Sequence, residues 1–392
     1  MSKLMFIHHS GLIGGAGISL TNNVVKLSEK NKTVVYIPSD PNTIAELIKK
    51  QSDKVEVVEY GRRIGAITIY SGGDKLFSKR FFYRLLLIAK QFKYWNQEID
   101  KQSPDIVLIN SKILCWMSLL PAIKKRKSVL FVRETTQGNT NRIINRIIRR
   151  LLEGFNVVSF LSEYDRKQEN LKIAKSVVIK NSINPLQLHS DVSRKEALKE
   201  LRLPQQKFHV LYVGGVSDMK GFDLAVQAVL KAGKEYGLIV AGNNFSDIVS
   251  NQLKDYAAFW KAYIKENDLQ RQILMVGRQN DMSQCYAACD VLLFPMRSMH
   301  QARPVFEAGY FKKPVIITDF ECIKEFVKDG ENGFTVPVNS VEEIVEKLHV
   351  LQQNPDLSRQ MGEENHRRTI EHHDPDRNFE KLMNVIEDTL SL

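Results

Sequence analysis

Residues 208–243 read FHVLYVGGVSDMKGFDLAVQAVLKAGKEYGLIVAGN, and this stretch decides the fold class. Apolar residues run through 208–215 and again through 237–243, which is the pattern of short buried strands. Between them, residues 222–236 repeat apolar side chains at helical spacing after a glycine-containing loop. A strand, a helix and a second strand in this order predict a βαβ unit with parallel strands.

The same alternation of apolar runs and amphipathic segments extends outward in both directions. Further strands are predicted at 4–9, 33–39, 55–60, 105–110, 128–134, 157–162, 176–181, 272–278, 291–295 and 314–319. We therefore predict an α/β protein with two Rossmann-like domains facing a central cleft. In such folds ligands bind at the carboxyl ends of the strands.

The predicted domain boundary lies in a segment without a strand, residues 182–205, which contains two prolines. We assign residues 1–184 to an N-terminal domain and residues 185–375 to a C-terminal domain. The last predicted helix, about 376–392, is a candidate to pack back on the N-terminal domain.

Composition indicates a globular protein, and the net charge differs between the two halves of the chain. The 392 residues are 43% hydrophobic and 26% charged, which is ordinary for globular proteins. Residues 1–185 carry 31 Lys and Arg against 15 Asp and Glu, a balance of +16, whereas the rest of the chain carries 25 against 30. A basic domain suits an anionic membrane, a phosphorylated acceptor or nucleic acid.

Several classes of protein are excluded. The longest apolar run, residues 113–123, is about half of what a membrane span needs. The N-terminal residues lack the apolar core and cleavage site of a signal peptide, so we expect a cytoplasmic protein. Four cysteines do not make a disulfide framework. Cys285 and Cys289 lack further ligands for zinc, and no metal site is predicted.

The first candidate site is the loop VGGVSDMKG at 213–221. Gly214 and Gly215 let a phosphate approach the backbone, the following helix offers free N–H groups, and Lys220 adds a charge. The spacing is neither that of a P-loop nor GxGxxG. The alternative is a tight turn with a solvated lysine.

The second candidate site begins at Arg303 and Pro304, where proline opens a helix at its first turn. Arg303 could partner an anion at this helix start, and Glu307 could hold the vicinal hydroxyls of a ribose. The alternative is an ordinary helix in which Glu307 complements the dipole.

A third glycine loop, SGLIGGAG at 10–17, follows the first strand and opens a helix. Gly14, Gly15 and Gly17 could receive a phosphate or a sugar there, or the loop could be an ordinary flexible connection. His8 and His9 end the preceding strand, so one of them points to each face of the sheet.

Taken in this order, the segments resemble the retaining glycosyltransferases of family 4, which have the GT-B fold. The resemblance covers nearly the whole chain and is strongest from about 176 to 340. The motifs that carry it are VIKNSIN (178–184), VGGVSDMKG (213–221), YAACD (286–290), PVFEAGYFKKPVIITD (304–319) and EFVKDGENGFTV (325–336).

The resemblance implies a donor-binding C-terminal domain and an acceptor-binding N-terminal domain. Lys220 would contact the diphosphate of a UDP- or GDP-sugar and Glu307 its ribose. Gly277 and Arg278 would line the base pocket, and Gly14 to Gly17 would close over the donor. The family needs no metal or other cofactor, because basic side chains and helix N-termini neutralise the leaving diphosphate.

The chain departs from the family pattern at several positions. The first of two paired glutamates falls on Met299, the donor-loop arginine falls on Gly215, and a histidine of the first domain falls on Arg133. In one interpretation, Arg303 or Arg278 replaces the missing charge and groups near His300 replace the glutamate. In the other, the protein has lost catalysis.

Two basic stretches stand out in the first half: KRFFYRLLLIAKQFKYW at 79–95 and RIINRIIRRLLEGF at 142–155. Both mix cations with apolar side chains at helical spacing, which suits an anionic membrane surface. The alternative is a core helix with a solvated basic side. Nucleic acid is not expected as a partner, because no recognition module is evident.

We therefore expect a retaining, metal-independent glycosyltransferase of bacterial-type surface polysaccharide biosynthesis. It would transfer a sugar to a glycan acceptor, lipid-linked in our first interpretation, at the inner face of the membrane. Lys220, Arg303 and Arg133 are the expected catalytic residues. The alternatives are a catalytically silent relative that binds donor or glycan as an assembly partner, and a nucleotide-sugar epimerase.

Overall fold

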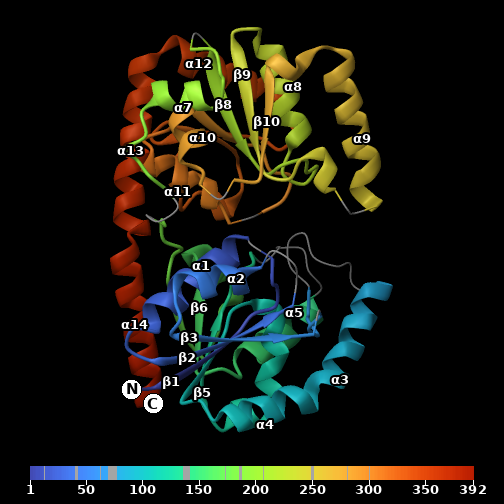
Figure 1. Cartoon of the computed structure of the whole chain (residues 1–392), viewed down its shortest axis with the longest axis vertical. Coiled ribbons are helices and arrows are strands. Elements are labelled where there is room, and N and C mark those ends of the chain that lie inside the picture. Colours follow the sequence, from blue (N-terminus) through green and yellow to red (C-terminus); the bar gives the residue numbers. More distant parts are fainter. Residues whose placement is uncertain are drawn as a thin grey trace. The chain divides into compact units, whose positions relative to one another are not determined.

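The computed structural model describes residues 1–12, 14–39, 43–61, 63–68, 77–135, 142–172, 174–184, 188–205, 207–248, 251–279, 281–299 and 301–392. The chain divides into two units, each with its own parallel sheet (Figure 1). The first unit comprises residues 1–182 and 375–392, and the second comprises residues 183–374. The last helix of the chain therefore belongs to the first unit.

In the first unit the strands are ordered β3-β2-β1-β4-β5-β6-β7. They are β1 (Lys3–Ile7), β2 (Lys32–Pro38), β3 (Val55–Tyr60), β4 (Ile106–Ile109), β5 (Lys127–Phe131), β6 (Val157–Phe160) and β7 (Lys175–Val178). The order reverses beside β1, where Leu4 lies opposite Thr33 on one side and Ile106 on the other. In open α/β sheets ligands bind beyond the carboxyl ends of the strands at such a reversal.

Helices cover both faces of this sheet. One face carries α1 (Gly15–Leu27), α2 (Ile44–Gln51) and α14 (Pro375–Ser391). The other carries α3 (Lys79–Gln102), the 3₁₀ helix η1 (Lys112–Leu119), α4 (Pro121–Lys124) and α5 (Arg142–Leu152), and α6 (Glu163–Glu169) precedes β7. Leu20 and Ile386 are buried on the first face, and Trp95, Trp116 and Ile148 on the second.

The second unit repeats this architecture with the strand order β10-β9-β8-β11-β12-β13. The strands are β8 (Phe208–Val213), β9 (Tyr236–Ala241), β10 (Ile273–Gly277), β11 (Val291–Phe294), β12 (Val315–Thr318) and β13 (Gly333–Val336). The helices are α7 (Arg194–Glu200), α8 (Phe222–Ala232), η2 (Phe245–Asp247), α9 (Asn251–Glu266), η3 (Leu269–Arg271), α10 (Ser283–Ala288), α11 (Arg303–Tyr310), η4 (Glu321–Ile323), α12 (Val341–Gln353) and α13 (Pro355–His373). One face packs on α8, α9 and α12 through Phe222, Trp260 and Leu348.

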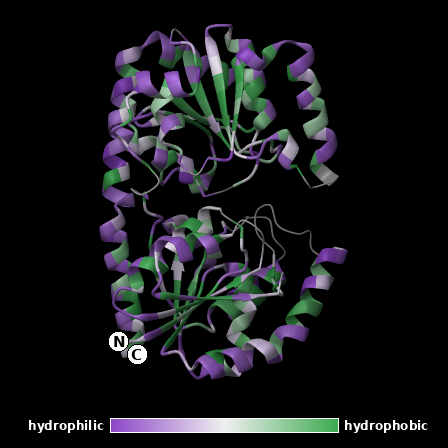
Figure 2. Ribbon diagram, in the orientation of Figure 1, coloured by the Kyte–Doolittle hydropathy of each residue, from purple (hydrophilic) through white to green (hydrophobic). Residues whose placement is uncertain are grey.

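Both units thus confirm the predicted α/β class with two Rossmann-like domains. The stretch at 208–243 forms β8, α8 and β9, and β8 pairs with β9 in parallel. Figure 2 shows hydrophobic strands inside each unit and helices with a hydrophobic and a hydrophilic side. That distribution is the source of the apolar runs and the helical periodicity in the sequence.

One element differs from the expectation, and one apolar run for which no element was predicted forms a 3₁₀ segment. The first helix begins at Gly15 instead of residue 18, because Gly14 already has the extended backbone of an N-cap residue. The long apolar run that starts at Ile113 is not a strand or a regular α-helix but the buried 3₁₀ segment η1 and the start of α4. No helix in the described parts of the chain is both long enough and apolar enough to cross a membrane.

Candidate functional site

The loop after β8 makes a close turn that only glycine can form. The N–H groups of Gly214 and Gly215 both donate to the carbonyl of Ala241 at 2.9 Å. Gly215 has a φ of +63°, and a Cβ at this position would lie 2.3 Å from the backbone nitrogen of Asn243. The turn therefore holds the loop backbone against the end of β9 and excludes any side chain at residue 215.

The same loop places Lys220 at the start of α8. The helix is preceded by Gly221, which has a φ of +74° and whose Cβ would lie 2.1 Å from the carbonyl oxygen of Pro295. A Cβ on Gly214 would lie 2.9 Å from Cδ of Lys220. Gly214 thus leaves room for the lysine, and Gly221 lets the loop pass close to the end of β11.

The environment of Lys220 favours an anion. Its amine makes no hydrogen bond or ion pair with any residue that the structure describes, and burial lowers its pKa. The hydroxyl of Tyr212, which also lies beside Gly214, is buried with no hydrogen-bond partner in the described chain. Gly221 offers no side chain to cap α8, and the first two N–H groups of the helix have protein partners: Phe222 donates to the carbonyl of Ser217 and Asp223 to the hydroxyl of Tyr256, both at 3.1 Å. A cation beside an unsatisfied hydroxyl suits a phosphate.

Arg297, which the sequence analysis missed, fixes this loop. Its guanidinium donates to both carboxylate oxygens of Asp223 at 2.7 and 2.5 Å, and to the carbonyl and carboxylate of Asp218 at 2.7 and 2.8 Å. Its Nε donates to Asn339, and its backbone N–H donates to the carbonyl of Met219 at 3.0 Å. The loop that carries Lys220 is therefore bound to the segment after β11.

The carboxylate of Asp223 is the centre of this arrangement. Burial disfavours its charged form, but the hydrogen bonds and charge of Arg297 outweigh burial and hold its pKa below the usual value. The hydroxyl of Tyr256 also donates to Asp223 at 2.9 Å. Asp223 is thus a charged anchor for Arg297.

The end of β10 adjoins the glycine turn. Gly277 has a φ of +73°, and its carbonyl accepts from Gly242 at 2.9 Å. Arg278 is exposed, and its Nε donates to the side-chain oxygen of Asn243 at 2.5 Å. Because Asn243 also adjoins Gly215, the structure brings the predicted residues at 214–215, 220 and 277–278 to one edge of the sheet.

Arg303 and Glu307 form an ion pair inside α11. Nε of Arg303 donates to Oε1 of Glu307 at 2.7 Å, and the hydroxyl of Tyr286 donates to Oε2 at 2.8 Å. Both charged side chains are largely buried. Glu307 is therefore fixed in orientation while lone pairs remain on both oxygens. His300 lies outside the described residues.

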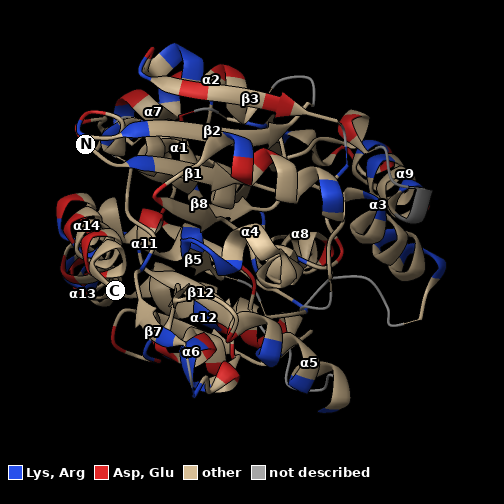
Figure 3. Ribbon diagram, turned by 90° about the horizontal axis from the view of Figure 1, so that it is seen from below, with Lys and Arg blue, Asp and Glu red and all other residues tan. Residues whose placement is uncertain are grey.

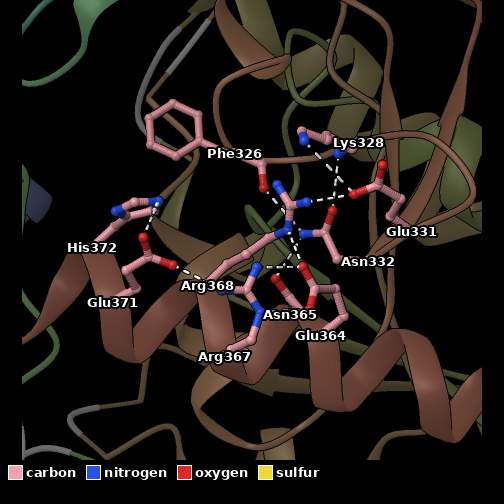
Figure 4. Close-up of polar contacts among 10 residues, drawn as sticks. All are labelled: Phe326, Lys328, Glu331, Asn332, Glu364, Asn365, Arg367, Arg368, Glu371 and His372. Atoms are coloured by element: carbon pink, nitrogen blue, oxygen red, sulfur yellow. Dashed lines mark hydrogen bonds and ion pairs between the residues drawn. The ribbon is translucent and has the colours of Figure 1, made fainter.

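Helix α13 holds α11 through a buried polar cluster, part of which is shown in Figure 4. The side-chain amide of Asn365 donates to the carbonyls of Lys313 at 2.9 Å and Val305 at 3.3 Å, and its oxygen accepts from Asn332 at 3.1 Å. The hydroxyl of Thr369 donates to the carbonyl of Phe306 at 3.3 Å. Two of these contacts fall on α11, so α13 sets the position of the Arg303–Glu307 pair.

Arg133 lies in the first unit, just beyond β5. Its Nε donates to the side-chain oxygen of Asn110 at 2.9 Å, and its Nη1 to that of Asn181 at 3.3 Å. Asn110 follows β4 and also contacts Nδ1 of His8 at 3.2 Å. Burial and the neighbouring His9 lower the pKa of His8, so its ring is neutral. Polar side chains from three strands thus meet at one carboxyl edge of this sheet.

The three glycines of the N-terminal loop have different surroundings. Gly14 and Gly15 are exposed at the start of α1, which no side chain caps. Gly17 is buried, and a Cβ there would lie 2.1 Å from Cδ1 of Ile44 in α2. Close packing of α1 against α2 accounts for Gly17, whereas Gly14 and Gly15 present free backbone at a helix N-terminus.

The two units have a known fold, and the second unit matches a family model. Two Rossmann-like units, each with its own parallel sheet, constitute the GT-B fold. Residues 193–368, most of the second unit, match the model of the family described as Glycosyl transferases group 1.

Curated relatives agree with that match. An uncharacterised glycosyltransferase of Haemophilus influenzae is 29% identical over 39% of this chain and 42% of its own length. The lipopolysaccharide core biosynthesis mannosyltransferase LpsB of Rhizobium meliloti is 27% identical over 44% of this chain and 49% of its own. The chain spans about half the length of these relatives.

Solved structures match over the full length. Anabaena Alr3699/HepE in complex with UDP superposes with a TM-score of 0.78 at 16% identity, covering 99% of this chain and all of that one. WaaG, a glycosyltransferase involved in lipopolysaccharide biosynthesis, gives a TM-score of 0.69 at 14% identity over 96% of this chain and 98% of its own. At these identities the likeness establishes the fold.

Proposed function

We propose that the protein is a retaining glycosyltransferase that moves a sugar from a UDP- or GDP-sugar to a glycan acceptor carried on a lipid. The observation that carries the proposal is Lys220, a half-buried amine without a partner in the described chain, beside the buried and unpartnered hydroxyl of Tyr212. Residues 193–368, which include it, match the group 1 glycosyl transferases. The complexes of Anabaena Alr3699/HepE with UDP and with UDP-glucose support this type of donor.

In this proposal Lys220 holds the diphosphate beside the hydroxyl of Tyr212, and Arg297 keeps Lys220 in place. Arg303 is neutralised by Glu307, whereas the only partner of Arg278 among the residues that the structure describes is the neutral amide of Asn243. Arg278 is therefore the better candidate for the charge that the family places at Gly215. The free lone pairs of Glu307 accept the ribose hydroxyls.

The reaction is the departure of a nucleoside diphosphate from the sugar, with acceptor attack on the same side. Negative charge develops on the leaving phosphate, and fixed cations and N–H groups stabilise it in the transition state. No metal is required in this proposal. Arg133 and the exposed start of α1 are the groups of the first unit that we assign to the acceptor side.

A thermal-shift screen against UDP, GDP, ADP, CMP and their sugar conjugates tests the proposal. A ligand that binds only the folded protein raises the melting temperature by mass action. We expect UDP or GDP to do so and Lys220→Met to reduce the shift at the same nucleotide concentration. To test metal independence, the release of nucleoside diphosphate from the sugar conjugate is measured in EDTA, where we expect it to continue. To test retention, NMR of the product should show the same anomeric configuration as in the donor. The absence of a shift with every nucleotide would reject the donor site.

Met299 supports a second candidate function, a silent relative that binds donor or glycan as an assembly partner. The family's first glutamate falls at this position, and a thioether cannot replace the charge of a carboxylate. Two results together would favour this alternative. A nucleotide would raise the melting temperature, but no nucleoside diphosphate would be released from the sugar nucleotide, whichever surface glycan is supplied as acceptor. Turnover that depends on Lys220 would exclude it.

A further inference from the structure

We propose that the outward sides of α3 and α5 form a docking surface for an anionic lipid bilayer. The apolar part of this docking surface is Phe82, Tyr83 and Leu86 on α3, and Ile143 and Ile147 on α5. The proposal does not rest on the transferase activity, because every residue in it belongs to the first unit, whereas the proposed donor-binding residues belong to the second.

The exposure of these side chains is unusual for helices of a folded domain. Leu86 is 62% exposed and Phe82 51%, and on α5 Ile143 is 66% and Ile147 51% exposed. Phe82 and Leu86 are four residues apart, as are Ile143 and Ile147, so each pair forms a stripe along one side of its helix. Isolated exposed apolar residues need no explanation, whereas paired stripes indicate an interaction surface.

Cations flank both stripes. Residues 77–97 contain five Lys and Arg and no Asp or Glu, and α5 contains four Arg and no acidic residue. Lys79, Arg80, Lys90 and Lys93 are exposed and make no ion pair in the part of the chain that the structure describes. Figure 3 shows the basic segments on α3 and on α5. These charges are therefore available to a partner of opposite sign.

Both helices cover the same face of the first sheet. The buried sides of α3 and α5 enter one apolar cluster, through Trp95 and Ile99 from α3 and through Ile148 and Leu152 from α5. Their outward sides are therefore both directed away from that face. Between Lys79 and Gln102, only Trp95 and Ile99 are fully buried, so the N-terminal half of α3 contributes little to the core.

A bilayer fits these observations better than other occupants. Aliphatic and aromatic side chains can enter the headgroup boundary while the surrounding cations meet anionic headgroups. A second copy of the chain would bring like charges together. Nucleic acid would be bound by the cations but would leave Leu86 and Ile143 without an apolar environment.

The surface on α9 offers a matched control. Phe259 is 59% exposed, and its ring stacks on that of Tyr263 at 6.1 Å. This pair is as apolar as the stripes on α3, but α9 mixes its lysines with Asp255 and Glu266. A membrane that recognises both apolar surface and positive charge should distinguish the two helices.

The test is co-sedimentation of the full chain with vesicles of phosphatidylcholine alone or with about 30% phosphatidylglycerol. We expect binding to the anionic vesicles, weakened by salt. F82S/L86S and I143S/I147S should each weaken it by about tenfold or more. K79Q/K90Q/K93Q should do the same, and F259S/Y263S should not. Unchanged melting temperatures and UDP shifts would show that the variants are folded and that the donor site is intact.

Several results would overturn the proposal. The chain could bind neutral vesicles as well as anionic ones, or bind neither kind. The α3 and α5 variants could bind as the wild type does, or the α9 control could lose as much binding as they do. Finally, the chain could form a dimer in vesicle-free solution that the α3 and α5 substitutions dissociate. The last result would assign the surface to a second copy. Tighter binding to RNA than to the anionic vesicles would assign it to nucleic acid. If the protein showed no transferase activity but still bound anionic vesicles, that result would contradict the proposed reaction and leave the docking surface supported.

Discussion

Lys220 has a side chain whose charge is costly in the free protein. Burial lowers its pKa, and no described residue offers a compensating charge or acceptor. A protein keeps such an arrangement when a ligand supplies the missing partner, because preorganised unpaired groups are typical of binding sites. The residue therefore reduces stability in favour of binding.

Lys220→Met should separate these two effects. We expect UDP or GDP binding to weaken by about 1.5–3 kcal/mol, the range for hydrogen bonds to a charged group, which is tenfold or more in Kd. We expect the melting temperature without ligand to stay equal or rise, because the half-buried, unpaired charge is gone. Calorimetry and a melting curve measure the two quantities. A variant that melts lower and binds normally would remove Lys220 from the site.

The pH dependence follows from the sign of the pKa shift. A lysine whose pKa is lowered on folding binds fewer protons in the folded than in the unfolded state, so wild-type stability rises as pH rises through the lowered pKa. The stability advantage of Lys220→Met should therefore shrink as pH rises. Wild-type affinity for UDP should fall over the same interval, because the phosphate needs the protonated amine. A pH-independent affinity above neutral pH would contradict this role.

Gly215 stands where the resemblance to the family 4 enzymes would place an arginine, and its surroundings leave no room for that side chain. Its φ of +63° and the 2.3 Å approach to the nitrogen of Asn243 exclude any Cβ without movement of the loop. Gly215→Arg should therefore not restore a charge but should destabilise the protein by about 2 kcal/mol or more. Gly61→Ala is the control, since a Cβ there meets nothing within 4 Å. Chemical denaturation measures both. Tighter UDP binding by Gly215→Arg at normal stability would refute the argument.

At the scale of elements, the site depends on loops that are bound to one another. Arg297 connects the loop before α8 to the segment after β11, and Asn365 and Thr369 connect α13 to α11. Each connection joins segments far apart in the sequence. The parallel sheet supplies the common edge, and the side chains fix the loops upon it.

Arg297→Lys keeps the charge but removes the planar fork that contacts Asp218 and Asp223. We expect a loss of about 1–3 kcal/mol of stability. We also expect weaker binding of UDP but unchanged binding of uridine. Lys220 contacts only the phosphates in our proposal, and uridine has none. Arg359→Lys is the control, since its pair with Asp356 is exposed. Equal losses for UDP and uridine would indicate general unfolding instead of a positioning role.

Much of each sheet could be predicted because buried parallel strands are uninterrupted apolar runs, as in β8 and β9. The loop with Lys220 was also recognisable from its glycines. Arg297 was not, because a single arginine in a loop carries no periodicity and its partners are 74 and 79 residues away. The pairing of Arg303 with Glu307 could have been inferred from their spacing of four residues.

At the scale of the whole molecule, the end of the chain completes the unit in which the chain begins. Leu382, Val385 and Ile386 of α14 are buried in the cluster that includes Leu4 and Phe6 of β1. The ion pairs of the same helix, Lys26–Asp376 and Lys175–Asp388, are exposed and contribute little. The stability of the first unit therefore depends on apolar packing across almost the full length of the chain.

Leu382→Ala tests this dependence. The side chain is 1% exposed, so its truncation leaves a cavity that should cost about 2–5 kcal/mol. We expect a lower melting temperature, and limited proteolysis with mass spectrometry should locate the new cleavages within residues 1–182. Because UDP stabilises only the unit that binds it, UDP should protect residues 183–374 in the variant. Asp388→Ala should resemble the wild type, and new cleavages confined to the second unit would contradict the assignment of α14.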